Sequence, residues 1–322
     1  APPGRMSVAP EEHQPRAWTM NEWYVQNSLW RTSPAAPGSA SIEPSEAEAY
    51  SGHHWVVTYV VGEEPLRPGS HLAIEVPSGW TPHLGRPLHS GRQVLVPAGD
   101  VNPGYAAWTR VEAGPGTRFE LRVSDCTRFQ VIDAVLTEGE VPPGHQVRIY
   151  IGTEDGSRLR SPWFAQESPL AMGVDLGGDG IYLPVVPPPS VTVTGAQADR
   201  LRVFAPATAQ PGEEVAVRLQ AVDQYNANLA RGYQGRVELE ASGPLAGLPK
   251  AVNLTREDGS QALISAKASG AGVALIRAFD RAWPLAGISN PVGVGFCDPD
   301  ERIVFGDLHG QMYVSIGTGT LD

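Results

Sequence analysis

The residues best suited to chemistry lie near the end of the sequence, at Asp307 and His309. They follow the apolar run Ile303-Val304-Phe305 and are flanked by Gly306 and Gly310. Side chains two residues apart on an extended strand point the same way, so both can reach one divalent cation. A carboxylate is a hard ligand and an imidazole a borderline one. The pattern predicts a metal site at the carboxyl end of a strand, where α/β folds hold their active sites.

This predicted site is incomplete within the sequence. Gln311 falls on the same side of the strand, but an amide is a weak ligand. A metal site typically needs at least three protein ligands, and Asp307 and His309 supply two. We therefore expect a divalent ion, zinc, manganese or iron, to bind only with further ligands from a longer protein, and we expect no catalytic residue in this chain. The alternative is a surface strand end with an incidental histidine.

A second candidate is an aromatic cluster near the start of the sequence, in which Trp23 and Trp30 accompany Trp18 and Tyr24. Exposed rings of this kind can form a platform on which sugars stack. The alternative is an N-terminal strand that packs its rings onto the first domain, because aromatic residues favour strands and fill cores.

Composition limits the elements that can position these residues. Of 322 residues, 36 are Gly and 30 are Pro, about one in five, so long helices are not expected. A hydrophobic share of 41% and a charged share of 18% are typical of a globular protein with a core. The formal charge, 24 minus 35, is -11, and without basic clusters nucleic-acid binding is not expected. We also expect no transmembrane segment, because the sequence has no apolar run of 18 residues.

Alternating hydrophobic residues predict strands in the first half of the chain. Trp55, Val57, Tyr59 and Val61 share one face of a strand, and the range 72–76 shows the same alternation. Further alternating runs at 119–123 and 147–151 are separated from these by Pro-Gly turn signals. We predict an arm at 1–17 and a β-sandwich domain at 18–186.

A second sandwich is predicted after Pro187-Pro188-Pro189, which we interpret as the start of a linker at 187–195. Residues 196–299 contain alternating runs at 201–204, 215–222, 237–241, 262–266, 273–279 and 292–296. The phrases Val222-Asp223-Gln224-Tyr225-Asn226 and Gly232-Tyr233-Gln234-Gly235 resemble bacterial immunoglobulin-like domains. The predicted fold is therefore all-β, with two consecutive immunoglobulin-like β-sandwiches followed by the first strand of a truncated α/β metal-hydrolase domain.

Three other features are interpreted without catalysis. The segment Asp175-Leu176-Gly177-Gly178-Asp179-Gly180 is faintly similar to a calcium loop, but a Gly-rich hairpin turn is the preferred interpretation. His53 and His54 are interpreted as surface or edge residues at the start of a strand. Asn253-Leu254-Thr255 is a glycosylation triplet that we place on a loop.

Residues 305–322, FGDLHGQMYVSIGTGTLD, resemble the opening of the metal-dependent hydrolase domain in a large family of uncharacterised bacterial proteins, domain of unknown function thirty-six-oh-four. That domain is similar to the polymerase-and-histidinol-phosphatase (PHP) superfamily of phosphoesterases. The resemblance implies that His309 is the first histidine of the superfamily's H-x-H metal pair. Gln311 stands where that pattern has its second histidine.

The same motif is also similar to the start of the calcineurin-like phosphatases, which have G-D-x-H-G at a strand end. In the Ser/Thr phosphatases among them a Gln follows, as Gln311 does in this sequence. That resemblance implies a two-metal centre that activates water for attack on phosphorus. The range 317–320, Gly-Thr-Gly-Thr, suits it less well, because this run is a poor helix start.

These observations support two classes of function. In the first, the chain is the non-catalytic N-terminal accessory region of a metal-dependent phosphoesterase-like hydrolase, with residues 300–322 as the start of a catalytic domain that the chain lacks. In the second, it is a stand-alone β-sandwich protein that acts as a spacer or binds carbohydrate or protein. Substrate, oligomeric state and compartment, either cytoplasmic or exported with a signal peptide removed, stay open.

Overall fold

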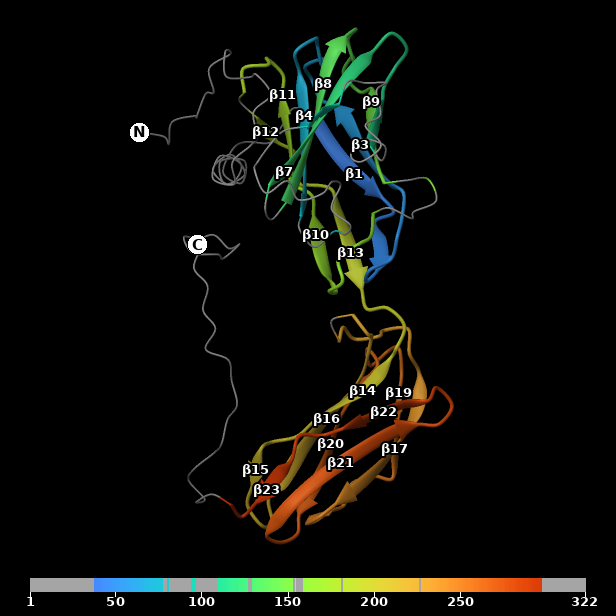
Figure 1. The fold of residues 1–322 in the computed structure, drawn as a ribbon, viewed down its shortest axis with the longest axis vertical. Helices are drawn as coiled ribbons and strands as arrows, with labels where there is room; N and C mark the ends of the chain where they lie inside the picture. The colour runs from blue at the N-terminus through green and yellow to red at the C-terminus, as the bar shows by residue number, and fades with distance from the viewer. Residues whose placement is uncertain are drawn as a thin grey trace, which may run out of the picture. The chain divides into compact units, whose positions relative to one another are not determined.

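The computed structural model describes residues 38–77, 80, 94–96, 109–126, 129–152, 154, 159–180, 182–225 and 227–296. Every regular element in these ranges is a β-strand, which confirms the all-β prediction for this part of the chain (Figure 1). The predicted arm at 1–17, Trp23, Trp30 and the start of a hydrolase domain at 300–322, with Asp307, His309 and Gln311, lie outside the described residues.

The chain divides into two compact units. The first consists of Ala1–Ala196 together with Tyr225–Asn228, and the second of Gln197–Gln224 together with Leu229–Asp322. Each unit has its own cluster of buried hydrophobic residues.

One antiparallel sheet of the first unit has the strand order β1-β3-β9-β6. Its strands are β1 (Gly38–Glu43), β3 (Trp55–Val61), β9 (Gln146–Ile151) and β6 (Thr109–Glu112). In β3 every second residue, starting with Trp55, is buried, as the alternation predicts. One face of this sheet therefore belongs to the core.

A six-stranded sheet of the first unit has the order β12-β11-β4-β8-β7-β5. Its strands are β12 (Leu183–Pro184), β11 (Met172–Asp175), β4 (His71–Pro77), β8 (Phe129–Glu138), β7 (Arg118–Cys126) and β5 (Val94–Val96). The alternation at 72–76 predicts a strand with one buried face, but the structure differs at β4, where both faces are buried from His71 to Ile74. Polar side chains on the second face must then find partners within the protein.

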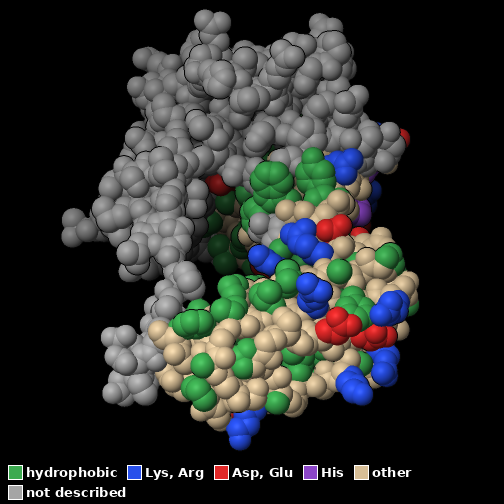
Figure 2. Space-filling model, turned by 60° about the horizontal axis from the view of Figure 1, so that its bottom comes forward, with side chains coloured by type: hydrophobic (Ala, Val, Ile, Leu, Met, Phe, Trp, Pro, Cys, Tyr) green, Lys and Arg blue, Asp and Glu red, His purple; other side chains and the backbone are tan. Residues whose placement is uncertain are grey.

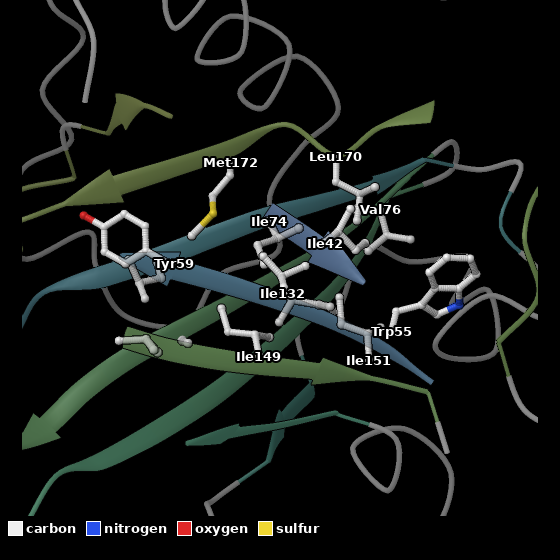
Figure 3. Packing of buried hydrophobic residues seen from close by; sticks show 14 of the residues in the cluster. Ile42, Trp55, Tyr59, Ile74, Val76, Ile132, Ile149, Ile151, Leu170 and Met172 are labelled. Atoms are coloured by element: carbon white, nitrogen blue, oxygen red, sulfur yellow. The ribbon is translucent and has the colours of Figure 1, made fainter. Parts of the chain in front are cut away.

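The core of the first unit fills the space between these sheets, and Figure 3 shows part of it. The buried residues drawn and labelled are Ile42, Trp55, Tyr59, Ile74, Val76, Ile132, Ile149, Ile151, Leu170 and Met172. Two indoles stand edge to face in this core, since the ring centroids of Trp55 and Trp80 are 4.6 Å apart and their planes meet at 74°.

A third sheet of the first unit corrects the predicted linker at 187–195. It has the order β10-β13-β2, with strands β10 (Gln166–Pro169), β13 (Ser190–Thr194) and β2 (Glu46–Glu48). The prolines do not continue into a linker, because Val191 and Val193 are buried at alternate positions of β13. The first unit accordingly extends to Ala196.

The second unit contains two sheets. One has the order β14-β16-β20-β18 and is formed by β14 (Arg200–Phe204), β16 (Glu214–Val222), β20 (Gln261–Ala268) and β18 (Leu245–Ala246). The other has the order β15-β23-β21-β17-β19, with β22 on β21, and is formed by β15 (Thr208–Ala209), β23 (Val292–Val294), β21 (Gly272–Asp280), β17 (Gly235–Ser242), β19 (Ala251–Leu254) and β22 (Leu285–Ile288).

All six strands predicted in the second unit are present, with bounds within three residues of the prediction. Their inward residues are aliphatic, as in β16, where Val215, Val217 and Leu219 are fully buried. The strand β19 was not expected, and it includes Asn253, which we had placed on a loop. Asn253 is an exposed residue of this strand, which among the described residues pairs with β17 at the end of its sheet.

Candidate functional site

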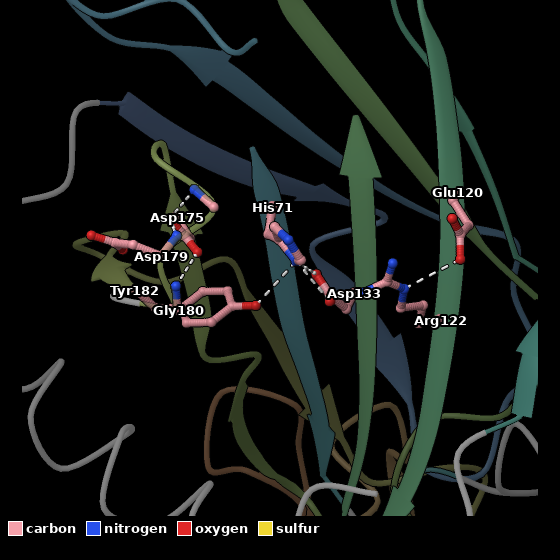
Figure 4. Close-up of polar contacts among 9 residues, drawn as sticks. His71, Glu120, Arg122, Asp133, Asp175, Asp179, Gly180 and Tyr182 are labelled. Carbon is pink, nitrogen blue, oxygen red and sulfur yellow. Dashed lines mark hydrogen bonds and ion pairs between the residues drawn. The ribbon is translucent and has the colours of Figure 1, made fainter. Parts of the chain in front are cut away.

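A buried polar cluster occupies the second face of the six-stranded sheet. It joins His71 on β4, Asp133 on β8, Asp175 at the end of β11 and Tyr182 just before β12 (Figure 4). Strand register brings them together. Asp175 on β11 pairs with His71 on β4, and Asp133 on β8 pairs with Ala73, which lies two residues after His71 on the same face of β4. Side chains from neighbouring strands therefore meet on one face.

The centre of the cluster is the contact between His71 and Asp133. The Nδ1 atom of His71 lies 3.0 Å from Asp133 Oδ2 and 3.1 Å from Oδ1, so an Nδ1–H group donates to the carboxylate. Burial of His71 opposes its protonation, but the Asp133 carboxylate outweighs this effect and raises the pKa of His71 above its usual value. The two side chains form an ion pair when the imidazole is protonated.

The cluster continues along the sheet in both directions. The Tyr182 hydroxyl lies 3.3 Å from His71 Nδ1, and burial followed by the nearby Asp133 charge raises the pKa of this phenol well above its usual value. On the other side, Arg122 of β7 pairs in register with Asp133, and its Nε donates to Glu120 Oε1 over 3.3 Å. Charges of opposite sign thus follow one another across three strands.

Asp175 closes the glycine-rich loop that follows β11. Its Oδ1 accepts the backbone N–H groups of residues 177, 178 and 179 at 3.1, 2.8 and 3.3 Å, and its Oδ2 accepts that of residue 180 at 2.8 Å. β11 pairs antiparallel with β12, so the hairpin interpretation of this segment is confirmed. Burial raises the pKa of the Asp175 carboxyl, against the opposing effect of the Gly180 N–H. The carboxylate oxygens face N–H donors, which is the geometry of a turn rather than of a calcium loop.

A smaller buried pair lies in the second unit. The Tyr233 hydroxyl donates to Asp280 Oδ2 over 2.6 Å, and Asp280 Oδ1 accepts the N–H groups of Ala282 and Trp283 at 2.8 and 3.3 Å. Gly235 permits this close approach, because a Cβ there would collide with both the carboxylate and the phenol. Asp280 therefore fixes the turn between β21 and β22.

The two histidines at the start of β3 are half-buried and engaged in local contacts. His53 Nε2 lies 2.9 Å from Ser51 Oγ, and the same hydroxyl donates to Glu48 O over 2.6 Å. His54 stacks on Tyr150, with ring centroids 5.5 Å apart. These contacts attach the residues before β3 to Ser51 and Tyr150. Because β3 pairs with both β1 and β9, the two histidines precede an interior strand of their sheet.

These contacts hold strands and turns in place. The acids, the imidazole and the phenols of the cluster and of the Tyr233–Asp280 pair are bound to groups of their own unit, and their burial keeps bulk water away from them. No three His, Cys, Asp or Glu side chains are grouped to hold a metal ion within the part of the chain that the structure describes. In the same residues, no helix is long and apolar enough to cross a membrane. The predicted site residues Asp307, His309, Gln311, Trp23 and Trp30 lie outside this part.

The sequence contains no local motif for the cluster, since His71 is separated by 62 residues from Asp133 and by 111 from Tyr182. The available signal was a histidine at an alternate position of a strongly apolar strand. Such a residue must be paired if the strand is buried on both sides.

Comparison with known proteins gives an architectural likeness only. No protein-family profile matches the chain, and no curated protein matches it. Among solved structures, the chain resembles immunoglobulin-like domains of bacterial adhesins: the Escherichia coli adhesin FdeC (13% identity, TM-score 0.27, 81% of this chain and 65% of that one), the D00-D0 domain of intimin (11%, 0.29, 79% and 98%) and the integrin-binding protein invasin (11%, 0.23, 80% and 60%).

The chain thus spans less than two thirds of the FdeC and invasin chains. TM-scores of this size carry no argument about function, and the architecture rests on the strand pairing described above. The resemblance of residues 305–322 to metal-dependent hydrolases rests on the motif alone.

Proposed function

We propose that the two units form a non-catalytic region that recognises a partner and spaces it from the rest of the protein. The observation that supports this function is that each unit is stabilised by contacts within that unit. Each has its own hydrophobic core, and its buried ionisable groups hold strands and turns. A rigid scaffold of this kind leaves recognition to its surface.

The visible surface fits this function. Figure 2 shows one face of the molecule, on which the hydrophobic side chains of the described residues are scattered singly or in small groups among polar and charged ones. Among the described residues, exposed aromatic side chains include Trp163, Phe204, Tyr225, Trp283 and Phe296. Single exposed aromatic residues are the usual anchors of recognition surfaces.

A hydrolysis assay tests the non-catalytic part of the proposal. The purified chain is incubated with a phosphomonoester and a phosphodiester of p-nitrophenol in the presence of Mn²⁺ or Zn²⁺. We expect release of p-nitrophenol at the rate of buffer alone. Turnover that a chelator abolishes would overturn the proposal.

A second candidate function is specifically favoured by the motif at Asp307 and His309. In this proposal the sandwiches are the accessory region of a metal-dependent hydrolase, either PHP-like or calcineurin-like. The donor set is a carboxylate and an imidazole, fewer than the three protein ligands that a metal site typically needs, so no catalytic step is derived from it. The test is the zinc and manganese content of a longer protein that carries this region together with further metal ligands, purified with and without His309→Ala. Equal metal contents in the two proteins would contradict this role.

A further inference from the structure

Three aromatic residues of the first unit lie on segments that hydrogen bonds join, and we call them the aromatic platform: Tyr50, Trp163 and Tyr225. The Trp163 side chain is 52% exposed and that of Tyr225 is 37% exposed, whereas Tyr50 is half-buried. The rings of Tyr50 and Tyr225 have centroids 5.1 Å apart and are tilted by 44°. An indole that is half exposed in a folded protein is uncommon, because Trp is highly buried on average.

The backbone that carries Trp163 is held firmly. The side-chain amide of Asn228 accepts the Ala165 N–H at 2.7 Å and donates to the Trp163 carbonyl over 2.8 Å. The Tyr50 N–H donates to the carbonyl of Pro162 over 3.0 Å. The main chain on both sides of Trp163 is thereby fixed, and a fixed aromatic anchor loses little conformational freedom on binding a ligand.

Arg160 holds Tyr50, the half-buried residue of the platform, in place. Its guanidinium carbon lies 4.8 Å from the centroid of the Tyr50 ring, and its Nη1 donates to the Tyr50 carbonyl over 3.1 Å. Tyr50 has a φ of 58°, in the left-handed region that residues other than glycine seldom adopt. Backbone of this kind persists only where surrounding contacts impose it, and it is frequent at ligand sites.

We propose that the aromatic platform binds the sugar rings of a neutral polysaccharide. The C–H groups on one face of a pyranose ring carry partial positive charge and stack on the electron-rich face of an aromatic ring. Its hydroxyl groups can accept hydrogen bonds from a guanidinium such as that of Arg160. The net charge of -11 makes an acidic polymer the less favoured ligand.

The size of the platform supports a sugar over a protein partner. A fully buried aromatic side chain covers about 150–250 Å², so the exposed fractions of Trp163 and Tyr225 offer about 200 Å² together. A stable protein interface buries about 800 Å² on each partner, so a second copy of the chain or another protein would need a far larger surface.

This inference rests on the proposed recognition function, and its test separates the two. The full chain is run in native gels that contain xylan, mixed-linkage β-glucan, dextran, alginate or hyaluronan, and the dissociation constant is taken from its retardation. The test variant is Trp163→Ala. The matched control is Trp283→Ala, which removes an indole that is 47% exposed in the second unit.

We expect at least one of the three neutral polymers to retard the chain, Trp163→Ala to weaken that binding at least tenfold, and Trp283→Ala to change it less than twofold. Because the Trp163 side chain is exposed, this variant should keep the wild-type circular dichroism spectrum. Tyr225→Ser provides a second variant with the same expected loss.

Other results would overturn the inference in distinct ways. Retardation that both Trp163→Ala and Tyr225→Ser retain would refute the aromatic platform and leave the recognition function standing. Retardation by alginate or hyaluronan alone would refute the neutral class of ligand. No retardation in any polymer would refute binding of polysaccharide altogether. A dimer in light scattering that Trp163→Ala dissociates would show that a second copy occupies the platform.

Discussion

The two units stabilise similar sandwiches by different means. The first buries two tryptophans, a histidine and two aspartates, of which His71 and Asp133 form a pair. The second has a mainly aliphatic core with two buried acids, Asp223 and Asp280, and Asp280 accepts a hydrogen bond from the Tyr233 hydroxyl. The difference follows from the sheets. A strand buried on both faces, such as β4, must pair the polar residues of its second face, whereas the alternating strands of the second unit leave theirs in water.

The largest expected effect tests whether the two cores are separate. Trp55→Ala removes a fully buried indole, which should lower the free energy of unfolding of the first unit by about 3–5 kcal/mol. Hydrogen exchange in increasing urea, followed by mass spectrometry, reports each unit on its own. Val217→Ala is the counterpart in the second unit, with an expected loss of about 2 kcal/mol there. A common shift of both units in either variant would contradict the separation.

An intermediate effect is expected at the turn that follows β11. Asp175→Asn replaces an oxygen that accepts N–H groups with an N–H₂ group that faces them, so the first unit should lose about 2–3 kcal/mol of stability. Urea midpoints followed by circular dichroism measure the loss. Asp179→Asn is the control on the same turn, because that side chain is exposed and should change stability by less than about 0.5 kcal/mol. Equal losses would show that charge on the loop, rather than the hydrogen bonds of Asp175, stabilises it.

The smallest expected effect is a dependence of the stability of the first unit on pH, which the second unit should not show. The folded state raises the pKa of His71, so it holds the proton more tightly than the unfolded chain does. The resulting stabilisation is complete below about pH 6.5 and is lost as pH rises through the pKa of the folded state.

We therefore expect the urea midpoint of the first unit to fall as pH rises above about 6.5, and His71→Gln to remove that fall. Asp133 and Asp175 favour the charged imidazole, and Arg122 opposes it. A slope that is unchanged in His71→Gln would assign it to other groups. The second unit serves as the internal reference in the same experiment.

Sequence patterns predicted the second unit better than the first. Where one face of a strand is in water, alternation fixes the strand and its inward residues, as in β16 and β21. Short strands without alternation, such as β19, carry no such signal and form because β17 offers an edge to pair with. Pro187 to Pro189 indicated a linker, but proline is tolerated just before a strand, and Val191 and Val193 decide the outcome through burial.

The candidate site could not be predicted from local sequence patterns, for a different reason. The residues that meet at Asp133 or on the aromatic platform are distant in sequence. Strand register brings the first group together, and hydrogen bonds between turns and loops join the segments of the second. Tyr225 was noted only as part of an immunoglobulin-like phrase, and Trp163 gave no signal beyond its residue type. Exposure, which made both of them candidates, depends on the completed fold.

The pairing of β13 with β2 has a consequence for synthesis on the ribosome. These strands are parallel, and Thr192 pairs with Glu46. The third sheet therefore joins the second strand of its unit, β2, to the last one, β13. At a translation rate of about 5–20 residues per second, β2 leaves the ribosome roughly 7–30 s before its partner does. The first unit has to remain unfinished through that interval, and its unpaired strands are then accessible to chaperones or to neighbouring nascent chains.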